Sequence, residues 1–184
     1  MFYKNILEVI PIYMYGFLSC FSGLVLYDTL LYSTFNLFYT SWPILIYATL
    51  DYEFDKKMLV RRPRLYYIGL ENVYFSKWVF WRWAFYALWQ GTLIMCLAFY
   101  SLENDSPDSD GTQSGVWTSS NLIFAILVIV SNMKILISSY LINGIIIFFV
   151  FGSIAFYYLI YWMQSYGSVE SNQYGTLPVM MGTA

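Results

Sequence analysis

The sequence of 184 residues contains no histidine and only two cysteines, and 11% of its residues are charged. Without histidine, the most common general base and metal ligand at neutral pH is missing. Cys20 and Cys96 lie inside apolar runs and lack the close spacing of metal-binding cysteines, so we predict that both are buried and structural. A Gly-rich phosphate loop and an adjacent nucleophile and base are missing as well. The sequence therefore predicts neither a metal site nor a catalytic centre for hydrolysis or phosphoryl transfer.

Basic tracts with interleaved aromatic residues are also missing, and the formal net charge is only -2, so no nucleic-acid partner is expected. The acidic stretch of Asp51, Glu53 and Asp55 is the nearest approach to a cation site. We interpret it as a solvated segment where the chain leaves an apolar run.

What the sequence has in excess is apolar and aromatic side chains. Hydrophobic residues make up 59% of the chain, and 19 Tyr, 15 Phe and 7 Trp are more than a water-exposed surface tolerates. Five runs have the roughly 20 apolar residues that a helix needs to cross a bilayer. They cover about residues 6–26, 30–50, 78–100, 121–139 and 143–163. We therefore predict an all-α, polytopic transmembrane helix bundle with five spans, within residues 1–166.

Basic residues orient the predicted bundle, because loops rich in Lys and Arg stay cytosolic. Six of them lie between the second and third spans: Lys56, Lys57, Arg61, Arg62, Arg64 and Lys77. Loop 51–77 is therefore predicted to be cytosolic, and the acidic loop 101–120 and the tail 167–184 to be exoplasmic. Lys134 is expected to extend its long stem to the cytosolic headgroups. Asn104 fits the N-glycosylation acceptor pattern, with an acidic solvated turn as the alternative.

Charged and strongly polar residues near the start of the first span are candidates for a functional site, because such groups are costly inside a bilayer. Lys4 and Glu8 are four residues apart, so on a helix they share a face and could neutralise each other. Asn5 could hydrogen-bond to another helix. The alternative is that this first turn frays into the interface and its polar groups meet water. Pro11 is expected to kink or weaken the helix one turn further on.

Small and polar residues inside the other predicted spans indicate helix packing. Asn36 and Thr40 lie on one broad side of the second span, and Pro43 is expected to bend it. Gly91 in the third span and Gly152 in the fifth would let neighbouring helices approach closely.

Several short strings, in this order and spacing, resemble the C-terminal membrane region of the type IV P-type ATPases, the phospholipid flippases. The strings are Phe2-Tyr3-Lys4-Asn5, Phe21-Ser22-Gly23 with Tyr27-Asp28, Asn36 with Thr40-Ser41-Trp42-Pro43, Asp51-Tyr52-Glu53-Phe54, Pro63-Arg64-Leu65-Tyr66 with Gly69, and Gly152-Ser153-Ile154-Ala155-Phe156-Tyr157. Together they extend over about residues 2–166.

The resemblance implies that the five spans correspond to the fifth to ninth transmembrane helices of that family. It also implies that Lys4, Asn5 and Asn36 contribute to the lipid-translocation path. Counterparts of the phosphorylated aspartate motif and of the nucleotide-binding and actuator domains are missing from this sequence. No cofactor is therefore expected in this chain, and ATP and Mg would be bound by the missing domains.

Three functions remain open from the sequence. The first is the membrane-domain part of a phospholipid flippase, with membrane lipids and the missing flippase parts, in the same or other protein chains, as partners. The second is a catalytically inactive, flippase-derived structural subunit of a larger membrane complex. The third is an unrelated small channel or transporter.

Overall fold

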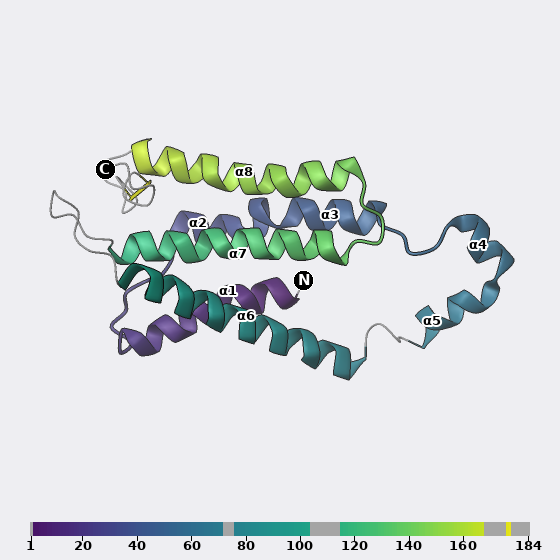
Figure 1. The fold of residues 1–184 in the computed structure, drawn as a ribbon, viewed down its shortest axis with the longest axis horizontal. Coiled ribbons are helices and arrows are strands. Elements are labelled where there is room, and N and C mark those ends of the chain that lie inside the picture. The colour runs from purple at the N-terminus through teal and green to yellow at the C-terminus, as the bar shows by residue number, and fades with distance from the viewer. Residues whose placement is uncertain (1, 72–75, 104–114, 168–175, 178–184) are drawn as a thin grey trace.

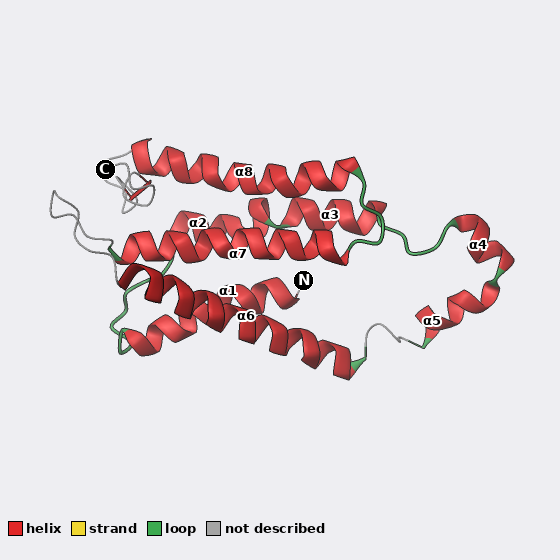
Figure 2. Ribbon diagram, viewed as in Figure 1, coloured by secondary structure: helices red, strands yellow, loops and turns green. Residues whose placement is uncertain are grey.

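A computed structural model describes residues 2–71, 76–103, 115–167 and 176–177. Within these ranges the chain is helical and contains no strand, which confirms the predicted all-α class (Figure 2). The elements are α1 (Phe2–Leu18), α2 (Thr29–Thr34), the π-helical turn η1 (Phe35–Tyr39), α3 (Ser41–Leu50), α4 (Lys56–Arg61), the short 3₁₀ turn η2 (Pro63–Leu65), α5 (Tyr66–Leu70), α6 (Lys77–Glu103), α7 (Val116–Ser138) and α8 (Gly144–Gly167).

The long helices form one elongated bundle (Figure 1). Helix α7 packs against both α6 and α8, α1 packs against α6, and α3 packs against α8. The segment with α4 and α5 projects from one end of the bundle, where α3 ends, α6 begins and α7 ends. Helix α1 starts part-way along the bundle, so its first residues lie at an intermediate depth.

Three described helices, α6, α7 and α8, are long and apolar enough to cross a membrane, so the prediction of five such spans is not confirmed. Helix α1 has 17 residues, a rise of about 26 Å against a hydrocarbon core of about 30 Å. It also carries Lys4 and Glu8, which lower its hydropathy. The second predicted span, about residues 30–50, is interrupted by η1.

The first predicted span also ends earlier than its hydropathy suggested. Helix α1 stops at Leu18, and the chain then turns through left-handed backbone at Cys20 (φ 51°), Phe21 (φ 53°) and Gly23 (φ 82°). Cys20 and Cys96 are both exposed free thiols, so the prediction that they are buried was wrong. An apolar run places a cysteine in the membrane region, but it does not say whether the residue faces the bundle or the lipid.

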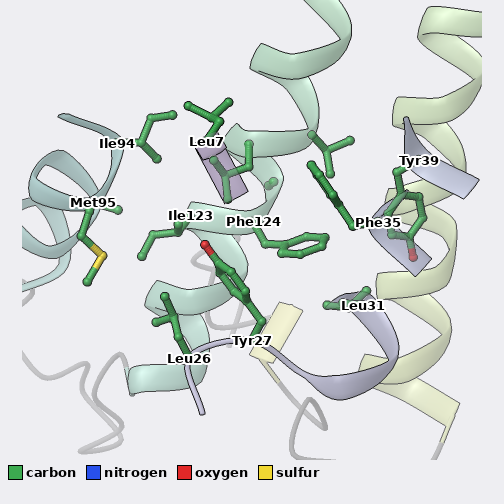
Figure 3. Packing of buried hydrophobic residues seen from close by; sticks show 14 of the residues in the cluster. Leu7, Leu26, Tyr27, Leu31, Phe35, Tyr39, Ile94, Met95, Ile123 and Phe124 are labelled. Carbon is green, nitrogen blue, oxygen red and sulfur yellow. The ribbon is translucent and has the colours of Figure 1, made fainter. Parts of the chain in front are cut away.

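The core is built around an aromatic cluster on α7 (Figure 3). Phe124 is 1% exposed, and its ring centroid lies 5.1 Å from that of Tyr27, 5.5 Å from Phe35 and 5.7 Å from Tyr157. Such edge-to-face and tilted pairs each contribute about 0.5–1.5 kcal/mol beyond the area that they bury. The cluster therefore holds the segment before α2, the turn η1 and helix α8 against α7.

Asp51, the residue that follows α3, stabilises the turn between α7 and α8 by hydrogen bonds. Its carboxylate accepts hydrogen bonds from the backbone N–H of Leu141 (2.7 Å), the backbone N–H of Tyr140 (3.3 Å) and the hydroxyl of Ser139 (3.2 Å). The stretch of Asp51, Glu53 and Asp55 is thus not solvated throughout, because Asp51 is half-buried and accepts three hydrogen bonds. The Asp51 carboxylate therefore gives hydrogen-bond acceptors to backbone N–H groups of the turn that would otherwise be unpaired.

Candidate functional site

A row of four polar side chains runs between α1 and the interrupted second helix. The Lys4 ammonium donates a hydrogen bond to the Thr40 hydroxyl (Nζ to Oγ1, 2.6 Å), and the Asn36 amide donates to the Glu8 carboxylate (Nδ2 to Oε2, 3.3 Å). Lys4 and Glu8 are four residues apart on α1, and their partners are also four residues apart. The residue numbers rise along α1 but fall from Thr40 to Asn36. The segments therefore pack antiparallel, and we call these four residues the polar seam.

The seam lies at a break in the second helix. The residue that follows η1, Thr40, donates from its hydroxyl to the carbonyl of Phe35 at 2.9 Å, five residues back, and the hydroxyl of Ser41 donates to the carbonyl of Asn36 in the same way. Single π-helical turns of this kind are often found at functional sites. Asn36 lies within this turn and Thr40 follows it, and both side chains reach partners on α1.

Pro43 and Asn132 explain how the break persists inside an apolar bundle. Proline has no N–H, so Pro43 cannot donate to the carbonyl of Tyr39, four residues back. That carbonyl accepts instead from the buried Asn132 side chain on α7 (Nδ2 to O, 2.9 Å). Backbone groups freed in a transmembrane helix must find such a partner, since lipid offers none.

The two charged members of the seam are deeply buried. Lys4 is 7% exposed and Glu8 is 2% exposed, and both lie on the inner face of α1 with Leu7 and Pro11. The second carboxylate oxygen of Glu8, Oε1, is buried and has no hydrogen-bond partner among the described residues. These charges are one helical turn apart, so each is the nearest countercharge for the other on α1.

The residues predicted for the lipid path do not all meet. Lys4 and Asn36 both belong to the seam, whereas Asn5 is exposed on the outer face of α1. Adjacent helix positions point about 100° apart, so Lys4 and Asn5 cannot share a face. Asn104, the predicted glycosylation site, lies outside the described residues. The sequence singled out Glu8, with Lys4, as an ionisable group near the start of the first span, but its partner Asn36 could not be found from spacing.

Two cavities border the seam at its ends. A cavity of about 330 Å³ is lined by Lys4 and Thr40, and one of about 630 Å³ is lined by Ile12 and Tyr32. In the antiparallel register, Ile12 and Tyr32 are one helical turn beyond the Glu8–Asn36 pair on either segment. That middle pair lines neither cavity and so lies between them along the seam.

Residues 1–184 match the family described as phospholipid-translocating P-type ATPase C-terminal. The chain is 31% identical over 156 residues to phospholipid-transporting ATPase 11C of Mus musculus and 27% identical over 168 residues to phospholipid-transporting ATPase 10 of Arabidopsis thaliana. These alignments cover 85% and 91% of this chain but only 14% of each relative. The chain belongs to the C-terminal family of phospholipid-translocating P-type ATPases, and the resemblance seen in the sequence is confirmed.

Proposed function

We infer that this chain is the membrane-domain part of a phospholipid flippase and that the polar seam forms part of its lipid path. The observation that carries the proposal is the burial of Lys4 and Glu8 against a helix broken at η1. An ionisable group in a transmembrane segment costs at least about 2.5–3.5 kcal/mol on insertion scales, so it is seldom kept without a role. A phosphate would replace Thr40 as the partner of the Lys4 ammonium, which gives a charge-assisted bond.

The seam also suggests how passage is controlled. The Glu8–Asn36 pair lies between the two cavities, so a headgroup that moves from one to the other must part these side chains. The π-helical turn is already irregular, and this makes it the segment of least resistance for such a movement. In this proposal Asn5 acts from the adjoining face of α1 and meets the headgroup only with the missing helices in place.

We propose that the interrupted α2–η1–α3 segment and α1 complete five crossings with α6, α7 and α8. The basic loop 51–77 then lies in the cytosol, while loop 101–120 and the tail 167–184 are exoplasmic. The arrangement supports this because α6 ends and α7 begins at the end of the bundle opposite to α4 and α5 (Figure 1). A Cys-less background with Arg61→Cys or Gly115→Cys tests it: only the second should react with an impermeant maleimide added outside intact cells.

Further protein is needed for activity. ATP and Mg are expected to be bound by flippase parts outside this chain. The outer face of α1 carries exposed Asn5 between exposed Phe2 and Val9, and lipid cannot satisfy an amide. A protein surface is therefore the expected cover for this face, whether it belongs to the same transporter or to a complex in which the chain is structural only.

The test is lipid transport by the complex that contains this chain, purified from native membranes and reconstituted in vesicles. ATP-dependent movement of a fluorescent phospholipid, read by its quenching with dithionite, should fall strongly for Lys4→Met and Asn36→Leu. The matched controls Lys56→Met and Asn143→Leu change exposed residues outside the seam and should retain transport. Complexes that assemble fully but move no lipid in any variant would establish the structural-subunit function instead.

A further inference from the structure

Glu8 and Tyr27 leave two buried oxygen atoms without a partner inside the bundle. Each side chain is 2% exposed, and neither Oε1 of Glu8 nor the hydroxyl of Tyr27 has a hydrogen-bond partner among the described residues. The two side chains interact electrostatically, and Figure 3 shows the Tyr27 hydroxyl pointing toward the part of the core where Leu7 of α1 lies. Buried oxygens without a partner are rare in folded proteins, so this pair needs an explanation.

The hydrogen bond that the Glu8 carboxylate accepts comes from a neutral group. Asn36 donates to Oε2, whereas the Lys4 ammonium, one helical turn away, donates to the Thr40 hydroxyl. A buried carboxylate without a bonded cation is costly, and a proton taken up at Oε1 removes that cost. The resulting O–H can donate to the Tyr27 hydroxyl, directly or through one water molecule. Protonation of Glu8 would therefore satisfy both buried oxygens at once.

Few titratable groups face Glu8 among the described residues. Lys4 on its own helix interacts with it, and so does Tyr27 from the segment before α2. The charges of α6 lie in its first two turns and at its last residue, and the one charge of α7, Lys134, lines the other cavity. The side chains that α6 and α7 place in the core with Leu7 are apolar: Ile94, Met95, Ile123 and Phe124 (Figure 3). Since an ammonium and a phenol are already protonated at neutral pH, Glu8 is the group here that can take up a proton.

The pair is reached from one side of the bundle. Tyr27 lines the cavity of about 630 Å³, whereas Glu8 lines neither cavity. The other walls of this cavity come from the second half of α1, the turn that follows it and the start of α2, at the end of the bundle opposite to α4 and α5 (Figure 1). A tyrosine hydroxyl both donates and accepts, so Tyr27 can pass a proton between this cavity and Glu8.

We propose that Glu8 and Tyr27 form a proton-binding site, in which Glu8 takes up a proton from the cavity of about 630 Å³ through the Tyr27 hydroxyl. Tyr27 gives its hydroxyl proton to Oε1 of Glu8, which becomes a neutral carboxyl group, and Tyr27 regains a proton from water in the cavity. The role of the site in transport rests on the proposed function: an ionised Glu8 repels a phosphate that passes Lys4, and the neutral form does not. In the proposed topology the proton comes from the exoplasmic side.

The test uses the complete chain with its native partners in lipid vesicles and reads the infrared band of protonated carboxyl groups. Difference spectra between about pH 8 and about pH 5, the range in which a buried carboxyl group titrates, should contain a band that Glu8→Gln removes. Asp55→Asn changes an exposed acidic residue outside the seam and should retain this band. If Glu8 stays ionised or stays neutral throughout, Glu8→Gln and the unchanged chain give the same difference spectrum, and the proposal is overturned.

A second measurement tests the route through Tyr27. After transfer to heavy water, the Glu8 band shifts as its proton is exchanged, and Tyr27→Phe should slow this shift at least about tenfold, the factor expected for one lost hydrogen bond. Tyr13→Phe removes the hydroxyl of an exposed ring that lines the same cavity and should exchange like the unchanged chain. Equal rates for the two variants would refute the route. The band does not depend on lipid transport, so a complex that moves no lipid but retains it would defeat the lipid path and leave the proton site standing.

Discussion

The charges of the polar seam should stabilise the bundle only as a pair. Lys4 and Glu8 are both more than nine-tenths buried and lie one helical turn apart. Residues four apart on a helix have Cβ atoms about 5–6 Å apart, and two unit charges about 6 Å apart attract by about 3 kcal/mol at an effective dielectric constant of about 20. Lys4→Met removes that attraction and the bond to Thr40 and leaves the Glu8 carboxylate without its nearest countercharge. We expect a loss of about 3–5 kcal/mol, the range seen when a buried pair loses one partner.

A double-mutant cycle measures the coupling itself. The double change Lys4→Met with Glu8→Gln should be less destabilising than the sum of the two single changes by about 3 kcal/mol, because no uncompensated charge remains. In thermal unfolding followed by circular dichroism in detergent, this is a difference of about 6–12 °C. Asn5→Leu, at the exposed adjoining position, should unfold close to the unchanged chain. Additivity within about 0.5 kcal/mol would show that the two charges do not interact and would refute their coupling within the seam.

Two further predictions concern helix packing, and both are read from the same unfolding curves. Asp51→Ala leaves the donors of the α7–α8 turn without their acceptor and should lower the free energy of unfolding by about 1–2 kcal/mol, or the melting temperature by about 2–8 °C. Asp55→Ala removes a side chain that makes no capping hydrogen bond to α4 and should be near neutral. Equal losses for the two variants would contradict the role of Asp51. Gly91→Ala would place its Cβ 3.0 Å from the Cβ of Ile10 and should cost about 1–3 kcal/mol, while Gly152→Ala meets no atom within 4 Å and should be tolerated.

The sequence predicted the helical class and the three long helices well, because α6, α7 and α8 are uninterrupted apolar runs bounded by polar segments. It predicted the second span less well for a physical reason. Mean hydropathy is an average over a window and does not show where the hydrogen-bond pattern of a helix breaks. The mostly apolar segment Phe35–Tyr39 therefore gave the same prediction as a regular helix. Pro43 was visible, but a proline is as compatible with a smooth bend as with a π-helical turn.

The seam shows a similar division between local and long-range information. The four-residue spacing of Lys4 and Glu8 predicted that they share a face, since that follows from helix geometry alone. Their partners, Thr40 and Asn36, depend on the register between two segments, and a single sequence contains little information on register. The pairing of Lys4 with Asn5 came from the resemblance, and in this structure the helix separates their side chains.

The break in the second helix and the donor that satisfies it belong to different elements, and this has a consequence for movement. Because Asn132 on α7 holds the Tyr39 carbonyl that Pro43 leaves free, η1 cannot shift unless this bond breaks or α7 moves with it. A shift of η1 would move Asn36 away from Glu8, since Asn36 lies within η1. If the seam is part of the lipid path, as proposed above, the long, regular helix α7 would resist or permit passage along it, although none of its residues belongs to the seam.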